Sequence, residues 1–247
     1  MQEKFLITNS DDFGMNKSIT DAIIETHING IITSTTLMVN MPGFDYAIKK
    51  AKEYPSLGVG IHFNLTEGKP ISPLSQIPDL IDEKGFFKKN TIQRKNLLVG
   101  KRIYRQAFIE LSAQLEKMIS NGIVPTHFDS HHHITGLPMA FRASIEAAKN
   151  FKISKARITN IDYNYSSTYN GSILSKTKNK FLNTPKVFIH NRNKARLRKK
   201  GFKTPDTKVL TARVLPVQPD EIKQFLQTLS VLKPGVTEIS FHPGYKN

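Results

Sequence analysis

The chain has 247 residues, enough for one large α/β domain, and this length does not require a second one. It contains no cysteine, which excludes disulfides and thiolate metal sites, and 36 Lys and Arg against 20 Asp and Glu give a formal charge of +16. No apolar run approaches the ~18 residues of a membrane span, and we find no signal peptide pattern at the N-terminus. We therefore expect a soluble, cytoplasmic protein with a single domain over residues 1–247.

The first 150 residues alternate between predicted strands and helices. Residues 18–29, for example, repeat apolar side chains at helical spacing, and Gly30 follows as a helix end. Strands are expected over 5–9, 32–40 and 57–65 and from Pro125 onward, with helices over 18–29, 44–54, 101–121 and 138–150. Further strands are expected over 155–159, 209–215 and 236–241, with a helix over 220–232. This alternation favours parallel strands joined by right-handed crossovers.

The positive charge is concentrated between Tyr163 and Pro205. This stretch holds eleven Lys and Arg and no Asp or Glu, so it supplies most of the net charge. Such a block attracts polyanions, for example nucleic acid, an anionic membrane surface or an acidic glycan. A solvated surface insertion explains the same composition and is the simpler interpretation. We treat residues 163–205 as a basic insertion in the single domain and leave contact with a polyanion or acidic glycan open.

Acidic and imidazole side chains follow the ends of four predicted strands. Asp11 and Asp12 lie at the C-terminal end of the first strand, and His62, His131 and His242 lie at or near the C-terminal ends of three later strands. In a parallel barrel or open sheet these strand ends meet at one face, where active sites form. Each group alone has a structural explanation, such as a turn, a helix cap or a core histidine. Together they indicate a site for Zn²⁺ or another divalent ion that performs hydrolysis.

Side-chain parity supports this grouping, because residues two apart on a strand share a face. If the strand that opens at Pro125 runs through the histidine run, then one face carries His127, Asp129, His131 and His133. Adjacent aspartates can divide the chemistry, since one binds the metal while the other accepts a proton from the bound water. A further histidine would protonate a leaving group or stabilise the developing oxyanion.

Five segments of the chain resemble motifs of the YdjC/ChbG-like carbohydrate deacetylases. Residues 9–14 (NSDDFG) are similar to the family's NADDFG, with Ser10 in place of its alanine. The other similar segments are GIITSTT at 30–36, GIHFNLT at 60–66, PTHFDSHHH at 125–133 and FHPGY at 241–245. They occur in the family's order over almost the whole chain, so the resemblance is specific.

The resemblance implies a distorted (β/α) barrel of the polysaccharide-deacetylase type, with parallel strands and the active site at their C-terminal ends. It implies an enzyme that uses a divalent metal ion, Mg²⁺ or Zn²⁺, to remove acetyl groups from N-acetylated sugars. The best-known substrates of the family are chitooligosaccharides such as diacetylchitobiose, so we expect a small carbohydrate as the binding partner. The oligomeric state stays open, with a homodimer among the options.

The resemblance also implies roles for single residues. The metal ligands would be Asp12, His62 and His131. Asp11 would be the general base, and His242 would be the acid or the oxyanion-stabilising group. We expect substrate contacts from four further residues, namely Arg157, Asn64, His133 and Tyr245. Arg157, at the end of its predicted strand, would steady either Asp11 or the substrate.

Two other functions are compatible with the residues alone. The same metal site would serve an esterase or a phosphoester hydrolase on the same barrel. A non-enzymatic protein would instead bind a polyanion through the basic insertion, with an affinity that falls steeply as salt is added. The deacetylase is our principal prediction, because hydrolytic side chains follow the strand ends and the motifs resemble that family.

Overall fold

The computed structural model describes residues 3–157, 191–210, 225–227 and 229–244. Its strands are β1 (Lys4–Phe13), β2 (Ser34–Leu37), β3 (Gly58–Phe63), β4 (Phe128–Ser130), β5 (Thr207–Leu210) and β6 (Gly235–Phe241). Its helices are α1 (Lys17–Ile28), α2 (Phe44–Glu53), α3 (Asn90–Asn96), α4 (Lys101–Ser120) and α5 (Pro138–Asn150). Short 3₁₀ turns cover Leu74–Gln76 and His131–Gly136, and a further helical segment covers residues 191–199.

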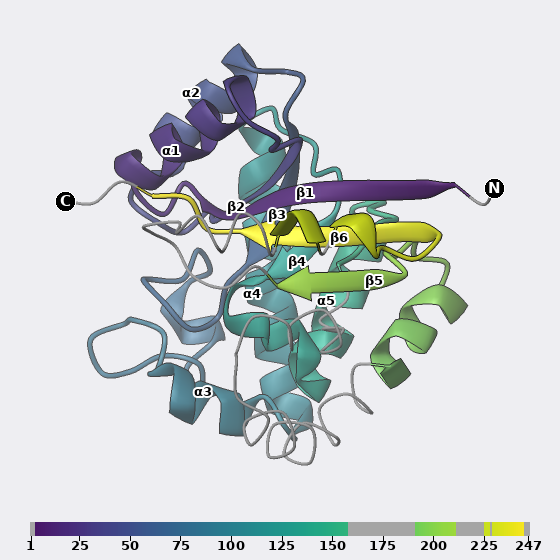
Figure 1. Cartoon of the computed structure of the whole chain (residues 1–247). Helices are drawn as coiled ribbons and strands as arrows, with labels where there is room; N and C mark the ends of the chain where they lie inside the picture. The colour runs from purple at the N-terminus through teal and green to yellow at the C-terminus, as the bar shows by residue number, and fades with distance from the viewer. Residues whose placement is uncertain (1–2, 158–190, 211–224, 228, 245–247) are drawn as a thin grey trace, which may run out of the picture.

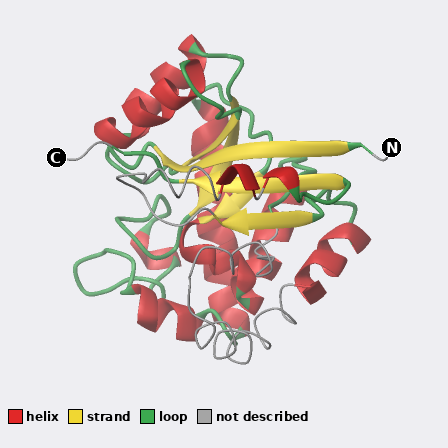
Figure 2. Ribbon diagram, viewed as in Figure 1, coloured by secondary structure: helices red, strands yellow, loops and turns green. Residues whose placement is uncertain are grey.

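The six strands form one parallel sheet in the order β4-β3-β2-β1-β6-β5 (Figure 1). Figure 2 shows the strands between two groups of helices, with α1 and α2 on one side and α3, α4 and α5 on the other. The sheet curls into a half-barrel, which agrees with the predicted distorted (β/α) barrel. Because every pairing is parallel, the C-terminal ends of all six strands lie at the same edge of the sheet.

A short segment around Arg157 extends the sheet beyond β4. The amide of Arg157 donates to the carbonyl oxygen of Phe128 (2.9 Å), and the amide of Phe128 donates to that of Lys155 (3.1 Å). On its other side Lys155 forms a parallel bridge with Lys203, which shortly precedes β5. The strand predicted over 155–159 is thus a pair of bridges, and its last two positions lie outside the described residues. The two edges of the curled sheet approach each other at this point.

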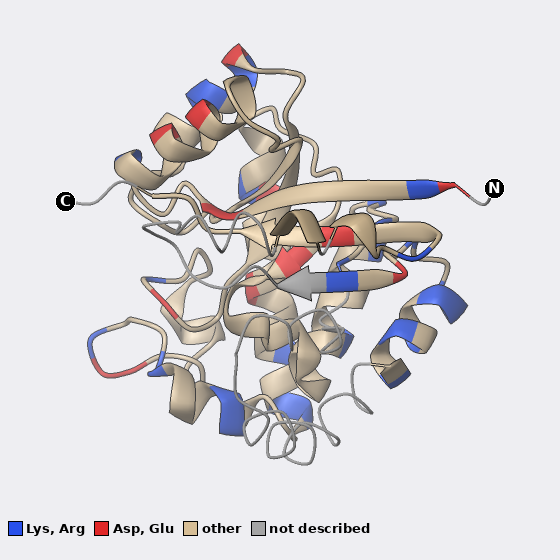
Figure 3. Ribbon diagram, in the orientation of Figure 1, with Lys and Arg blue, Asp and Glu red and all other residues tan. Residues whose placement is uncertain are grey.

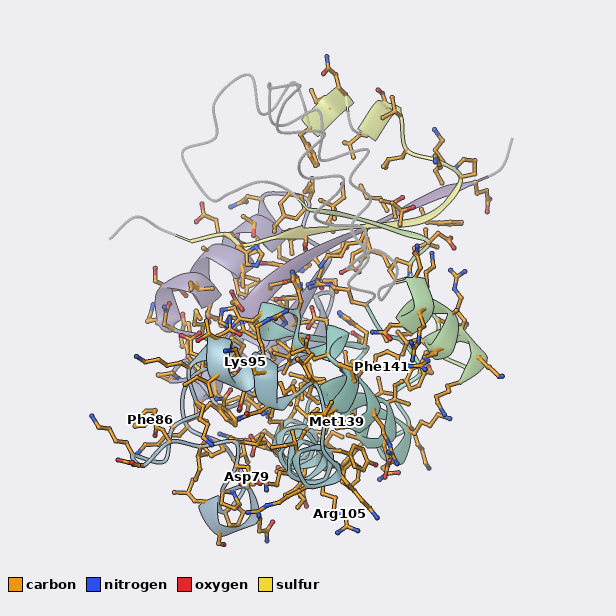
Figure 4. All side chains as sticks on the ribbon, turned by 90° about the horizontal axis from the view of Figure 1, so that it is seen from below. Asp79, Phe86, Lys95, Arg105, Met139 and Phe141 are labelled. Carbon is orange, nitrogen blue, oxygen red and sulfur yellow. The ribbon has the colours of Figure 1, made fainter. Side chains whose placement is uncertain are left out.

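The apolar face of α4 packs against α5 and the sheet. Ala107, Leu111, Leu115 and Met118 recur every three or four residues, which places them on one face, and all four are fully buried. Figure 4, which views the molecule from below, shows Phe141 in the helical layer under the strands, where it is part of the same core. Burying a side chain of Leu or Phe contributes roughly 1.5–3 kcal/mol. This layer therefore fixes α4 under the loops that follow the strands.

The polar residues of α4 hold the loop that follows β3. The carboxylate of Glu110, which is fully buried, accepts a hydrogen bond from the amide of Ser72 (2.8 Å). The side chain of Gln114 accepts from the amide of Asn64 (3.1 Å) and donates to its carbonyl oxygen (2.6 Å). These buried bonds fix the path of the loop that carries Glu67. From the sequence we expected no helix or strand in this segment, between residues 65 and 101.

The histidine run differs from the expected strand. β4 ends at Ser130, and His131 begins a 3₁₀ turn in which the φ angles of His132 and His133 are 50° and 54°. These left-handed conformations interrupt the alternation of a strand. The prediction of a strand through the whole run is therefore wrong beyond Ser130, and strand parity does not place His131 or His133.

Two other elements differ from expectation, and a third is described only in part. α3 was not predicted. β5 begins at Thr207, two residues before the predicted strand, and the later part of that strand lies outside the described residues. The helix predicted over 220–232 is described only in its second half. Among the described helices, none is both long and apolar enough to cross a membrane.

Candidate active site

Two aspartates near the C-terminal end of β1 face different neighbours. Asp12 has a φ of 68°, the left-handed conformation that Asp tolerates better than most residues. The register between β1 and β2 shifts at the same place, so the regular alternation of the strand is lost. As a result Asp11 contacts Arg157, whereas Asp12 contacts two histidines. The adjacent carboxylates are thereby placed in two separate environments.

Asp12, His62 and His131 form a compact group, which we call the metal-binding group. Oδ1 of Asp12 lies 3.3 Å from Nε2 of His62 and 2.9 Å from Nδ1 of His131. The three ligating atoms all lie within 4.8 Å of one another, so one ion could contact all of them. The two histidines are buried, while Asp12 is partly exposed. One carboxylate and two imidazoles, with positions left for water, suit Zn²⁺ or a similar divalent ion.

Each imidazole of the metal-binding group is held by a carboxylate at its other nitrogen. Nδ1 of His62 lies 2.6 Å from Oδ1 of Asp129. Nε2 of His131 lies 3.0 Å from Oε2 of Glu67. A carboxylate in this position accepts the N–H of the imidazole and turns the other nitrogen toward a metal, as is common for metal-ligating histidines. The donor set and its surroundings therefore fit a divalent metal ion.

The electrostatics of this group also favour positive charge. Burial alone would lower the pKa of His62, but the carboxylates of Asp129 and Asp12 raise it to about 10. Burial would raise the pKa of Asp12, but hydrogen bonds from His131 and His62 lower it below its ordinary value. The group therefore stabilises a cation between its carboxylates, which is the property that a metal site requires.

Arg157 connects Asp11 with two other buried carboxylates, and we call these four residues the Arg157 network. The two terminal nitrogens of Arg157 donate to the two oxygens of Asp11, each at 2.7 Å. Its Nε donates to Glu238 at 2.5 Å, and Nη1 also lies 2.5 Å from Asp129. Burial opposes the ionised form of Asp11, but the guanidinium beside it lowers the pKa of that carboxyl well below its usual range. Asp11 is therefore ionised at neutral pH and held in one orientation.

The described residues contain two other groups that could hold a metal, namely Asp11 with His62 and Asp129, and Glu67 with His131 and His132. In the first of these, the guanidinium of Arg157 already lies against both carboxylates. The group of Glu67, His131 and His132 shares His131 with the metal-binding group. In it, Nε2 of His131 already contacts the carboxylate of Glu67. The group around Asp12 is therefore the best candidate of the three.

His242 follows β6 and lies next to Asp11. Its Nε2 is 3.7 Å from Oδ2 of Asp11, and its side chain is 49% exposed. A half-exposed imidazole beside a buried carboxylate can reach a substrate that the carboxylate also faces. The structure therefore brings His242 and Asp11 together, as expected from the sequence.

Of the other expected substrate contacts, Asn64 and His133 lie among the described residues. Asn64 is fully buried, and its amide bonds to Asn40, Thr66 and Glu67, so it shapes the loop after β3. Burial and the charge of Lys208 lower the pKa of His133 to about 3, which keeps its imidazole neutral at physiological pH. Tyr245 lies outside the described residues.

Three charged residues of the site were missed by the sequence reasoning, namely Glu67, Glu238 and Lys208. Glu67 directly follows the GIHFNLT segment, and that position is the only signal it gives. Glu238 shares strand parity with His242, which indicates an inward-facing side chain. Lys208 gives no local signal, because its place depends on the pairing of β5 with β6.

Only the last part of the basic insertion lies in the described residues, since 158–190 fall outside them. In the helical segment over 191–199, the exposed basic residues are Arg192, Arg196, Arg198 and Lys199. Figure 3 shows Lys and Arg on this peripheral helix, whereas several Asp and Glu lie on the strands in the middle of the sheet. Contact with a polyanion remains a prediction.

The comparison with known sequences decides the family. A family profile described as YdjC-like protein matches residues 5–247. The chain belongs to the YdjC-like family. A carbohydrate deacetylase of Thermoanaerobacter pseudethanolicus is 31% identical to this YdjC-like chain over 242 residues, which are 98% of the chain and 82% of that protein. A carbohydrate deacetylase of Geobacillus stearothermophilus is 43% identical over 153 residues, which are 61% of the chain but only 58% of that protein.

Two solved structures resemble this YdjC-like chain. A protein of Enterococcus faecalis, described as a candidate cellobiose-phosphate cleavage protein, has a TM-score of 0.74 and 27% sequence identity. The match covers 100% of the chain and 83% of that protein, and it supports the distorted α/β barrel. The lactam utilization protein of Thermus thermophilus has a TM-score of 0.50 and 13% identity over 95% of the chain and 89% of that protein. The second likeness concerns the fold alone.

Proposed function

We propose that this YdjC-like protein is a metal-dependent hydrolase that removes the acetyl group from an N-acetylated sugar. The observation that carries the proposal is the metal-binding group beside a separate, ionised carboxylate, Asp11, with half-exposed His242 next to it. The relatives named carbohydrate deacetylases support acetylated sugars as the substrate class. Within that class, we propose a chitooligosaccharide such as diacetylchitobiose.

The metal-binding group and Asp11 would share the hydrolytic step. Asp12, His62 and His131 would hold a divalent ion, Zn²⁺ or Mg²⁺, which when bound polarises the acetyl carbonyl and acidifies a water. Asp11 accepts a proton as the water oxygen attacks the carbonyl carbon. Arg157 keeps Asp11 ionised and oriented for this transfer. The carbon–nitrogen bond then breaks and releases acetate and the free amine of the sugar.

His242 is suited to the second half of the reaction. The departing nitrogen needs a proton, and the developing oxyanion needs a hydrogen-bond donor. The imidazole of His242 is exposed enough to contact the substrate, and it lies beside Asp11, the proposed general base. We therefore assign it as the acid or as the oxyanion-stabilising group.

Replacing Glu67 by Gln should lower the affinity for Zn²⁺ by roughly tenfold or more, since groups that hold metal-ligating histidines commonly contribute 10–100-fold. The reason is that Glu67 accepts the hydrogen bond of His131 and turns Nδ1 of that ring toward Asp12. Competition between metal-stripped protein and a chromophoric chelator measures the affinity. Glu83→Gln, at an exposed position, is the matched control. Equal affinities for wild type and Glu67→Gln would show that Glu67 does not prepare His131 for the metal.

A second candidate function is cleavage of a phosphorylated sugar on the same site. It is favoured by one observation, the likeness to the Enterococcus faecalis protein described as a candidate cellobiose-phosphate cleavage protein. N-acetylated sugars and sugar phosphates should be offered to the protein at equal metal loading, with acetate and phosphate measured separately. Acetate without phosphate is the result we expect. Phosphate without acetate would replace the deacetylase with a phosphoester hydrolase.

A further inference from the structure

A buried lysine lies beside the Arg157 network and has no part in the mechanism above. Lys208 is on β5, where it pairs in register with Glu238 of β6, and it is 1% exposed. Its Nζ has no hydrogen-bond partner among the described residues. Such an ammonium group costs free energy, because it has lost its water and has gained no direct partner. We therefore expect a function of the buried ammonium group that offsets this free-energy cost.

The charges around Lys208 indicate that function. Burial and the nearby Arg157 lower the pKa of Lys208 to about 8, while Asp11, Glu238 and Asp129 oppose the shift. At neutral pH the side chain is therefore mainly protonated. Without Lys208, the three buried carboxylates of the Arg157 network would face the guanidinium of Arg157 and the imidazole of His62, which contacts only Asp129 among the three. Lys208 supplies a further cation, on the strand that pairs with the one carrying Glu238.

We propose that Lys208 is a positioning residue for Asp11, because its charge balances Glu238 and Asp129 and so leaves Arg157 in its two-pronged contact with Asp11. The proposal rests on the proposed function, in which Asp11 is the general base. Without Lys208, three carboxylates compete for Arg157, and the unbalanced charge draws the guanidinium away from Asp11. A small displacement of a catalytic group is enough to lower turnover strongly.

A packing role for Lys208 would have different consequences. Methionine occupies nearly the same volume without the charge, so Lys208→Met keeps the packing and removes the ammonium group. If only packing matters, this variant should behave as wild type. If the charge matters, the variant should lose turnover while it still folds, because methionine preserves the packing around β5.

The test compares Lys208→Met with Lys203→Met, which removes the same charge from an exposed position on the same edge of the sheet. The unfolding temperature, the Kd for Zn²⁺, and kcat and KM for an N-acetylated sugar are measured for both. For Lys208→Met we expect kcat to fall about tenfold with KM unchanged. Zn²⁺ should bind as tightly as in wild type or tighter, because a nearby positive charge is gone. Lys203→Met should match wild type throughout.

When wild-type protein releases acetate, two results would overturn the proposal. One is wild-type kcat in Lys208→Met. The other is a loss of kcat together with weaker Zn²⁺ binding and a lower unfolding temperature, which would assign a structural role. If Lys208→Met does not fold, Lys208→Gln is measured in its place against the same criteria. If wild-type protein binds Zn²⁺ but releases no acetate, the proposed function is contradicted, whatever Lys208 does. In that case the charge-balancing role is tested by Zn²⁺ binding alone, and weaker binding by folded Lys208→Met would overturn it.

Discussion

Asp11→Asn should lower the turnover of an N-acetylated sugar by roughly 10²-fold or more and leave the metal content unchanged, since a positioned general base typically contributes 10²–10⁴-fold. Asparagine keeps the size of the side chain but cannot accept the proton of the attacking water. Metal binding should persist because Asp11 contacts Arg157, whereas Asp12 is the aspartate that faces His62 and His131. Steady-state acetate release and metal analysis of the purified variant check the two halves of this result.

Asp45→Asn is the matched control for Asp11→Asn, because Asp45 is exposed in the first turn of α2. It should retain wild-type turnover and metal content. Wild-type turnover in Asp11→Asn would remove Asp11 from the mechanism. Loss of the metal in Asp11→Asn would instead show that both adjacent aspartates hold the ion.

Arg157→Met should lower the free energy of unfolding by about 3–5 kcal/mol, the range found when one partner of a buried ion pair is removed. Arg157 contacts Asp11, Asp129 and Glu238, and all four residues are buried. Methionine would leave three carboxylates close together with too little positive charge. The contacts also join β1 and β6 to the segment beside β4, so their loss weakens the closure of the half-barrel. Denaturant unfolding at neutral pH measures the effect.

The stability loss in Arg157→Met should depend on pH. The pKa values of Asp11 and Asp129 are lowered in the native protein by the charge of Arg157, against the effect of burial. A carboxyl group of this kind contributes stability above its unfolded pKa of about 4 and loses that contribution as the pH falls through the native value. The difference between wild type and Arg157→Met should therefore be largest near neutral pH and shrink in acid.

Arg102→Met is the control for the Arg157 substitution, because Arg102 pairs with Asp79 at 2.5 Å while its side chain is 72% exposed. An exposed ion pair of this kind contributes about 1 kcal/mol or less. If Arg157→Met costs no more than Arg102→Met, the Arg157 network does not stabilise the barrel.

Much of the site could be predicted because strand ends are visible in the sequence. The apolar run before Asp11 and Asp12 is a readable strand, and so is the one that contains His62. Parallel pairing then brings their C-terminal ends together without further information. His242 follows β6 in the same way. The alternation of strands and helices predicted the parallel sheet, and the family resemblance predicted the distorted barrel, which the structure and the comparison with known folds confirm.

The rest of the site depends on contacts that no local pattern contains. Glu67 reaches His131 because buried side chains of α4, among them Gln114, fix the loop after β3. Lys208 faces the Arg157 network because β5 pairs with β6 in one particular register. The turn at His132 replaces an expected strand, because two consecutive left-handed residues cannot be inferred from a polar run.

The central claim is tested most directly by measuring acetate release from diacetylchitobiose and a small panel of N-acetylated sugars. The protein is first stripped of metal, and Zn²⁺, Mg²⁺, Mn²⁺ or Co²⁺ is then restored singly. The proposed function predicts no release by the stripped protein and release with at least one restored ion. Release that is equally fast without any metal would contradict the role given to Asp12, His62 and His131. No release from any sugar, with an ion demonstrably bound to those residues, would contradict the deacetylase itself.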